Sequence, residues 1–277
     1  MPDLQRVPLV GEATANALKK LGINTISKLV SLREEECIAL ADRVKSISEK
    51  LAKDGYLKYR LVMAHRYAKA IKRRRPLILG RSSVVDGLFS YYKMKKILFF
   101  DLEYDPSKPF IFLIGAMETN GAFTQFFIKN ESEERETLAE LENITAGKVL
   151  VCYAGKSADM PTLRKCYAKH RLKAPRLELI DLFYDILFTQ NIRTQTIYLP
   201  VYNLDEKSVA RYLGYTRPSN LKIKDGLDAL IYFHRYLKER NARKKEEIKE
   251  QLLLYNYYDL EESRFILEKV FRLFSKM

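Results

Sequence analysis

The sequence has few residues that bind soft metal ions and no stretch typical of a membrane span. It contains only three Cys and three His. The cysteines form no Cys-x-x-Cys pair and the histidines are isolated, which argues against a zinc site. No segment approaches about 18 uninterrupted apolar residues, Met1-Pro2-Asp3 begins no signal peptide, and no collagen-like, Gln-rich or solenoid repeat is present. Scattered cysteines fit a reducing compartment. We therefore expect a cytoplasmic protein that is not associated with a membrane.

Positive charge is concentrated in the first third of the chain. The whole chain has 49 Lys and Arg against 35 Asp and Glu, a net charge of +14. Residues 1–96 hold 21 basic and nine acidic residues, whereas residues 97–277 hold 28 and 26. A basic module joined to a nearly neutral one is typical of phosphate-backbone binding. In the run Lys72–Arg75, Arg73 and Arg74 are candidate contacts, although a solvated helical surface or a basic linker explains such a run equally well.

Two acidic residues close an apolar stretch in the middle of the chain. Ile97-Leu98-Phe99-Phe100 indicates a buried strand. Asp101 and Glu103 follow two residues apart, so they share one face of that strand. Buried like charges are costly unless a cation meets them, and hard divalent ions prefer carboxylate oxygens. A metal site is one interpretation, and a strand that ends in a solvated acidic loop is the other.

Two later motifs also place acids at the ends of predicted elements. Val149–Cys152 indicates a second strand, followed by a glycine-containing turn and by Asp159 at the start of a helix. Near the C-terminus, Tyr255 and Asp259 stand four residues apart on one face of a predicted helix. If each motif is taken by itself, Asp159 is most simply an acid in the first turn of a helix, where it interacts favourably with the helix dipole. Tyr255 by itself is most simply an aromatic residue of the core. The order of the three motifs is what suggests a common site.

This order and spacing resemble the DEDD-type 3′–5′ exonucleases of the RNase H-like superfamily, in the subclass whose last motif contains tyrosine. Similar domains occur in predicted bacterial and archaeal nucleases. The resemblance extends from about Ile97 to the C-terminus and includes the stretches Tyr202–Tyr215 and Asp225–Leu230. The second motif departs from the family pattern, because Ala154 and Ala158 replace a usual Asn and a usual aromatic residue.

The resemblance implies a two-metal mechanism. The implied ligands of two divalent ions, Mg²⁺ or Mn²⁺, are Asp101, Glu103, Asp159 and Asp259. In that arrangement Asp101 bridges the ions, which activate water and stabilise the leaving oxygen. Tyr255 would orient the attacking water. The implied catalytic set is these four acids together with Tyr255.

Residues 7–29 resemble a helix-hairpin-helix unit. Gly11 forms a turn into a helix of small residues, Gly22 suits its C-cap, and Asn24 or Thr25 suits the start of a second helix. Backbone N–H groups of such units grip a phosphate without reading bases. A hairpin used only for packing is the alternative, because Leu9 replaces the first of two usual glycines. The expected nucleic-acid contacts are Gly11, Thr14, Lys19 and Lys20 in this unit, and Lys156 and Ser157 in the turn before Asp159.

The chain is long enough for two domains. We expect a small all-α helix-hairpin-helix domain over residues 1–75, a linker over 76–94 and an RNase H-like domain over 95–277. The first domain should include a long amphipathic helix from about Ser46. In the second, residues 189–202 are expected to form an irregular loop.

The fold class expected is α/β, a mixed sheet flanked by helices. Three strands with short connections predict an antiparallel meander, and strand-helix-strand steps then add parallel strands. The expected strands cover residues 97–102, 110–117, 123–128, 149–153 and 177–180. The expected helices cover residues 132–143, 159–170, 205–213, 226–240 and 244–274.

The sequence thus predicts a metal-dependent nuclease, most simply a 3′–5′ exonuclease acting on single-stranded DNA or RNA ends. A nucleic-acid-binding protein that keeps the fold without turnover is one alternative, favoured by Ala154 and Ala158. A structure-selective endonuclease that uses the same acids is another. The sequence identifies no protein partner.

Overall fold

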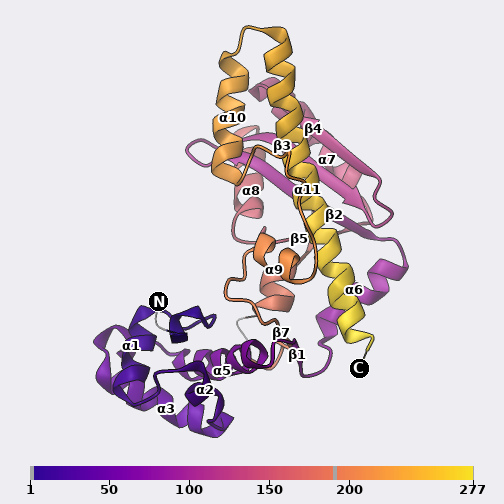
Figure 1. Ribbon diagram of the computed structural model, residues 1–277. Coiled ribbons are helices and arrows are strands. Elements are labelled where there is room, and N and C mark those ends of the chain that lie inside the picture. The colour runs from indigo at the N-terminus through magenta and orange to yellow at the C-terminus, as the bar shows by residue number, and fades with distance from the viewer. Residues whose placement is uncertain (1–2, 190–191, 277) are drawn as a thin grey trace. The chain divides into compact units, whose positions relative to one another are not determined.

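The computed structural model describes residues 3–189 and 192–276, which form two compact units. Unit 1 consists of the chain up to Val85, Phe183–Tyr212 and the end from Phe274, whereas unit 2 consists of Asp86–Leu182 and Leu213–Leu273. Unit 1 is mainly helical, and unit 2 contains the larger sheet (Figure 1). No helix among the described residues is long and apolar enough to cross a membrane.

A five-stranded mixed sheet forms the centre of unit 2. Its strands are β2 (Ile97–Asp105), β3 (Phe110–Glu118), β4 (Phe123–Phe127), β5 (Val149–Cys152) and β6 (Glu178–Asp181). The strand order is β4-β3-β2-β5-β6, with antiparallel pairs from β4 to β2 and parallel pairs from β2 to β6. The predicted α/β mixed sheet is confirmed.

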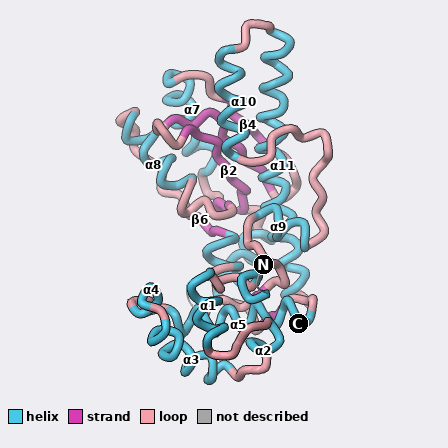
Figure 2. Tube along the Cα trace, turned by 60° about the vertical axis from the view of Figure 1, so that its left-hand side comes forward, coloured by secondary structure: helices cyan, strands magenta, loops and turns pink. Residues whose placement is uncertain are grey.

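Helices cover both faces of this sheet (Figures 1 and 2). The helices with residues in unit 2 are α6 (Ser83–Lys93), α7 (Glu131–Thr145), α8 (Asp159–Lys169), α10 (Gly226–Lys238) and α11 (Ala242–Phe274). Leu98, Phe100 and Leu102 of β2 pack in a core with residues of α7 and α8. On the opposite face, Phe112 stacks on Phe233 of α10 with ring centroids 4.4 Å apart. Because side chains alternate along a strand, Asp101 and Glu103 project away from the α7 and α8 side.

Helices that follow one another along the N-terminal part of the chain form most of unit 1. They are η1 (Asp3–Arg6), α1 (Glu12–Lys20), α2 (Ile26–Val30), α3 (Glu34–Ile47), α4 (Glu49–Ala52), α5 (Leu57–Arg73) and, from later in the chain, α9 (Glu206–Tyr212). Gly22 ends α1 with φ +81°, and the Ile23 N–H donates to the Leu18 carbonyl at 3.0 Å, as in a Schellman motif. Thr25 then caps α2, its Oγ1 accepting the Lys28 N–H at 3.1 Å.

The long amphipathic helix expected from Ser46 is wrong at its beginning, because the chain breaks before α5. The Asp54 carboxylate accepts the Tyr56 N–H at 2.9 Å, which favours a turn over a continuous helix. Leu9, just before α1, has φ +72°. That left-handed conformation costs a side-chain-bearing residue about 1–2 kcal/mol, so the chain holds Leu9 in a backbone geometry that suits glycine.

A later segment of the chain packs with the N-terminal helices. Strands β1 (Leu77–Ile78) and β7 (Ile197–Tyr198) pair antiparallel. The Tyr67 hydroxyl donates to the Leu187 carbonyl at 2.6 Å and accepts from Gln195 Nε2 at 2.8 Å. Leu187 ends the π-helical turn η2 (Leu182–Leu187). These buried contacts explain why Phe183–Tyr212 groups with unit 1.

Two connecting segments contain more regular structure than expected. Residues 76–94, expected to be a linker, contain β1 and the whole of α6, and residues 189–202, expected to be an irregular loop, contain β7. Residues 190 and 191 of that loop lie outside the described residues. The two-residue strands have no repeating pattern to reveal them, whereas the expectation of a linker overlooked the helix α6. The division into domains over 1–75 and 95–277 remains a prediction.

Candidate active site

Strand β2 presents two carboxylates to one face of the sheet. Asp101 lies opposite Gly115 of β3 and Glu103 lies opposite Leu113. Asp101 is half-buried and Glu103 is buried. The apolar residues that alternate with them fill the core on the other face, so the amphipathic alternation of the strand fixes both acids toward α11.

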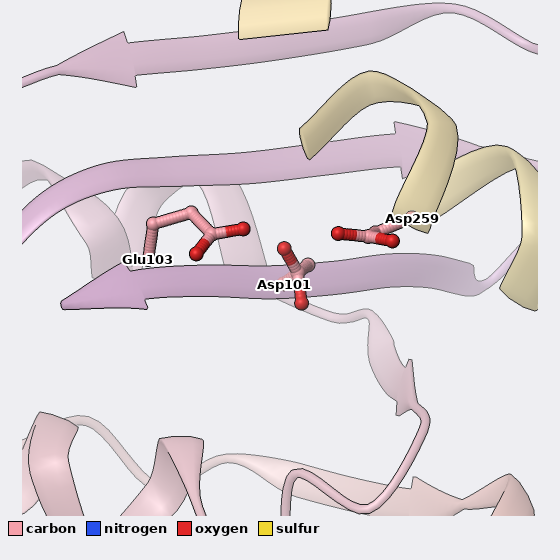
Figure 3. Close-up of side chains that lie close together, drawn as sticks. All are labelled: Asp101, Glu103 and Asp259. Atoms are coloured by element: carbon pink, nitrogen blue, oxygen red, sulfur yellow. The ribbon is translucent and has the colours of Figure 1, made fainter. Parts of the chain in front are cut away.

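Helix α11 adds a third carboxylate. Asp259 is buried, and its side chain approaches Asp101 from the side opposite Glu103, so that the two outer carboxylates point toward the central one (Figure 3). Each of the three acids offers an oxygen, and these oxygens all lie within 4.8 Å of one another. The structure therefore brings together three of the four acids expected as metal ligands.

The side chain of Asn256 fixes the central acid. Its Nδ2 donates to Asp101 Oδ2 at 2.7 Å, and its Oδ1 accepts from Gln125 Nε2 at 2.8 Å. Gly115 makes room for this amide, since a Cβ there would lie 2.8 Å from both Asn256 Cγ and Leu260 Cδ1. Sequence patterns included Asn256 between Tyr255 and Asp259 but assigned it no role.

The charge of the cluster calls for a cation. Burial, followed by the Asp259 and Asp159 carboxylates, raises the pKa of Asp101 well above its ordinary value, and the Asn256 amide and Arg217 offset only part of this effect. The cluster carries excess negative charge, and its carboxylate oxygens are the ligands that hard divalent cations prefer. Asp101, Glu103 and Asp259 thus form a cluster that can bind a hard divalent cation.

An arginine that sequence patterns did not indicate is also part of the site. Arg217 lies in the irregular segment before α10 and donates through Nη2 to Asp259. The same guanidinium contacts Glu262 with Nε at 2.6 Å from Oε1 and Nη2 at 2.8 Å from Oε2. Burial alone would lower the pKa of Arg217, but Glu262 and Asp259 raise it. No local motif could identify Arg217, because its partners lie more than 40 residues away in sequence.

Asp159 stands apart from the three clustered acids. It occupies the first turn of α8 and is buried. Burial, followed by the carboxylates of Asp181 and Asp259, raises its pKa to about 7. Its charge is therefore felt at the cluster, although its oxygens are not among those within 4.8 Å of one another.

Asp181, at the end of β6, is a buried acid that sequence reasoning missed. Its carboxylate accepts the N–H groups of Ala154 and Lys156, each at 2.9 Å. These bonds hold the turn that precedes Asp159. The sequence feature that could have identified Asp181 is its position as an acid at the C-terminal end of a predicted parallel strand.

Tyr255 lies one helical turn before Asp259 and is buried in an apolar cluster with Phe112 and Phe233. Burial, and then the nearby acids led by Asp259, raise the pKa of its hydroxyl strongly. The phenol is consequently protonated at neutral pH. The Arg217 guanidinium lies over its ring, 5.5 Å from the centroid.

The expected nucleic-acid contacts fall into separate groups. Lys156 and Ser157 are exposed in the turn before α8, where Ser157 Oγ donates to the Ala154 carbonyl at 3.0 Å. In unit 1, Gly11 and the buried Thr14 line a cavity of about 530 Å³ together with Lys50 and Arg60. The remaining four are exposed at helix ends, Lys19 and Lys20 in the last turn of α1, and Arg73 and Arg74 at the end of α5.

Comparison with protein-family models gives a match over most of unit 2. The model described as "RNase_H superfamily" matches residues 98–271, a range that includes all five expected catalytic residues. No curated protein and no solved structure matches the chain. The family match supports a nuclease-type fold and a nucleic-acid substrate, and the clustered acids can bind divalent metal.

Proposed function

Because the chain belongs to the RNase H superfamily, we propose that it is a metal-dependent nuclease, and specifically a 3′–5′ exonuclease of the DEDD type that hydrolyses single-stranded DNA or RNA from its ends. The observation that carries this proposal is the convergence of Asp101, Glu103 and Asp259 within 4.8 Å. The tyrosine one turn before Asp259 supports the assignment to the tyrosine subclass.

The proposed cofactor is a pair of divalent ions, Mg²⁺ or Mn²⁺, held by Asp101, Glu103, Asp159 and Asp259. Bound ions of this kind supply a water nucleophile at neutral pH and stabilise the leaving oxygen of a phosphodiester. Asp101 is the natural shared ligand because it lies between the other two clustered carboxylates (Figure 3). Asp159 would be the outer ligand, since its electrostatic effect reaches Asp101.

Other residues of the chain orient this machinery. Asn256 holds one oxygen of Asp101 through its amide, which leaves the other oxygen for a metal ion. Tyr255 keeps its proton because burial and the surrounding acids raise its pKa. A protonated hydroxyl beside Asp259 can donate a hydrogen bond and so orient a water molecule, which is the role we propose for Tyr255.

We further propose that residues 1–75 form a helix-hairpin-helix domain that binds the phosphate backbone, followed by a connecting segment over 76–94 and a nuclease domain over 95–277. The Schellman turn at Gly22 and the capped helix after Thr25 support a hairpin of this kind. Gly11 and Thr14 would contact phosphate through the cavity at the start of α1. Lys19, Lys20, Arg73, Arg74, Lys156 and Ser157 are the other proposed contacts.

A second candidate function is binding of nucleic acid without efficient turnover. Two observations favour it: Ala154 and Ala158 replace the usual residues of the second motif, and Arg217 already pairs with the proposed ligand Asp259. A structure-selective endonuclease would use the same acids and is distinguished by its products.

The test is cleavage of oligonucleotides labelled at the 3′ or the 5′ end, as single strands of DNA and RNA, with Mg²⁺ or Mn²⁺. A 3′–5′ exonuclease releases a 3′ label as mononucleotides at once and shortens a 5′-labelled strand stepwise. Asp101→Asn should abolish cleavage while oligonucleotide binding persists. Binding without cleavage by the parent would support the second candidate, and cleavage of circular single strands would support an endonuclease.

A further inference from the structure

Unit 1 has a second cavity, of about 370 Å³, beside the N-terminal end of α5. Tyr56, Tyr59, Arg60 and Met63 line it from one face of that helix, and Leu9 lines it from the turn before α1. Tyr56 is 69% exposed and Tyr59 is 39% exposed. The volume of the cavity is within the range of pockets that hold small ligands. Two exposed aromatic rings thus border a cavity that is also lined by the apolar side chains of Leu9, Met63 and Phe188.

The residue that forms one wall of this cavity is the strained Leu9. A glycine would adopt φ +72° without strain, yet the chain has a leucine whose side chain lines the cavity. Retained strain of this kind marks positions where a side chain is needed in a particular place. The Leu9 carbonyl also accepts from Arg60 Nη2 at 3.4 Å, which ties the turn to α5.

Charged groups of both signs border the aromatic surface, because Lys58 and Arg60 are cationic and Asp54, which lines the cavity, is anionic. Arg60 is held by Asp54 at 2.7 Å, and the Lys58 ammonium lies 4.9 Å from the centre of the Tyr59 ring. Arg60 and Asp54 also line the neighbouring cavity at Gly11 and Thr14, so the two cavities adjoin. Residues 1–75 contain 17 Lys and Arg against eight Asp and Glu, a balance that attracts polyanions.

We propose that this cavity binds one unstacked base of a single-stranded nucleic acid. The inference rests on the proposed nucleic-acid function and assigns to unit 1 a site for the bases of the single strand. Tyr56, the more exposed of the two rings, is the one proposed to stack on the base, and stacking on aromatic rings is how proteins hold single strands without sequence preference. A base in a duplex is already stacked and cannot enter, so the cavity discriminates against double strands.

The experiment is fluorescence anisotropy of a dye-labelled single-stranded DNA oligonucleotide with the full chain in EDTA, which prevents cleavage. Tyr56→Ala should weaken binding by about 5- to 150-fold, the range for loss of one stacked base, and Tyr56→Phe should bind as the parent does. An oligonucleotide of equal length made of abasic spacers should show no loss from Tyr56→Ala. The matched control is Tyr202→Ala, because Tyr202 is 54% exposed in the same unit and does not line the cavity.

A second variant separates binding from stability. Leu9→Gly should relieve the backbone strain, keep the melting temperature within a few degrees of the parent, and still lose affinity for the base-bearing strand. Equal losses on abasic and base-bearing strands, or full affinity in both Tyr56→Ala and Leu9→Gly, would overturn the base pocket. In that case the proposed nuclease still stands if the parent binds and cleaves. A parent that binds no oligonucleotide overturns both.

Discussion

Replacing Arg217 should make the protein dependent on metal for its stability. In Arg217→Gln, the buried carboxylates of Asp259 and Glu262 lose the guanidinium that contacts both. Breaking a buried ion pair on one side costs about 3–5 kcal/mol, so the metal-free variant should unfold at a distinctly lower denaturant concentration than the metal-free parent. Urea unfolding in EDTA measures this difference.

The same substitution should strengthen metal binding. Arg217 competes for Asp259 with any cation that Asp101 and Glu103 also bind, and its removal frees that carboxylate. We expect an increase in Mn²⁺ affinity of about tenfold or more, equivalent to ~1.4 kcal/mol, by calorimetric titration. Mn²⁺ at about 100 times its Kd should then return roughly 2.7 kcal/mol of stability to the variant.

Arg264 provides a matched control, because it lies on the same helix as Asp259 and Glu262. Arg264 donates to Glu261 at 2.9 Å and to Glu268 at 3.3 Å, but all three side chains are partly exposed. Arg264→Gln should therefore cost less than about 1 kcal/mol and leave Mn²⁺ affinity unchanged. If Arg217→Gln behaves like this control in both measurements, the guanidinium is not the counter-cation of the acidic cluster.

Three further substitutions test the site and its support. Tyr255→Phe should lower turnover by about 10²–10⁴ while unfolding free energy changes by only about 1 kcal/mol; full activity would leave Tyr255 a core residue. Gly115→Ala should cost about 1–3 kcal/mol by overpacking and weaken Mn²⁺ binding, whereas Gly87→Ala, in open space on α6, should not. Burial would raise the pKa of Glu134, but its bonds from Lys169, His170 and a backbone N–H lower it below 4.5. The ionised Glu134 carboxylate therefore stabilises the fold at pH values above the pKa it has in the unfolded chain, and this stabilisation is lost as the pH falls through its pKa in the folded chain. Glu134→Gln should lower the free energy of unfolding near neutral pH by about 3–5 kcal/mol. It should also make the free energy of unfolding, measured with urea, fall less steeply on acidification.

Local patterns were sufficient for the sheet and for the shared direction of Asp101 and Glu103. The apolar run Ile97–Phe100 predicted the burial of β2, and the two-residue period of a strand predicted the common direction of Asp101 and Glu103. The helices of unit 2 carry strong periodicity, and the predicted bounds of α8 and α11 differ from the observed ones by one or two residues. Such features depend on neighbours within one or two turns.

Features that depend on distant partners could not be predicted. Arg217 has no motif of its own, and its role appears only when the chain brings it to Asp259 and Glu262. Likewise β7 consists of two residues that pair with β1, more than 100 positions earlier. The break before α5 does not depend on distant partners. The pair Asp54-Gly55 marks a turn in the sequence itself, and the expectation of a continuous helix from Ser46 overlooked it.

The interrupted path of the chain has a consequence for biosynthesis. The N-terminal helices leave the ribosome first, yet Tyr67 finds its hydrogen-bond partners Leu187 and Gln195 only after more than 110 further residues have been made. Until then its buried hydroxyl and the edge of β1 lack their final partners. Unit 1 therefore completes its folding after the sheet strands of unit 2 have been synthesised, and a truncated chain that ends before residue 183 should expose this surface to chaperones.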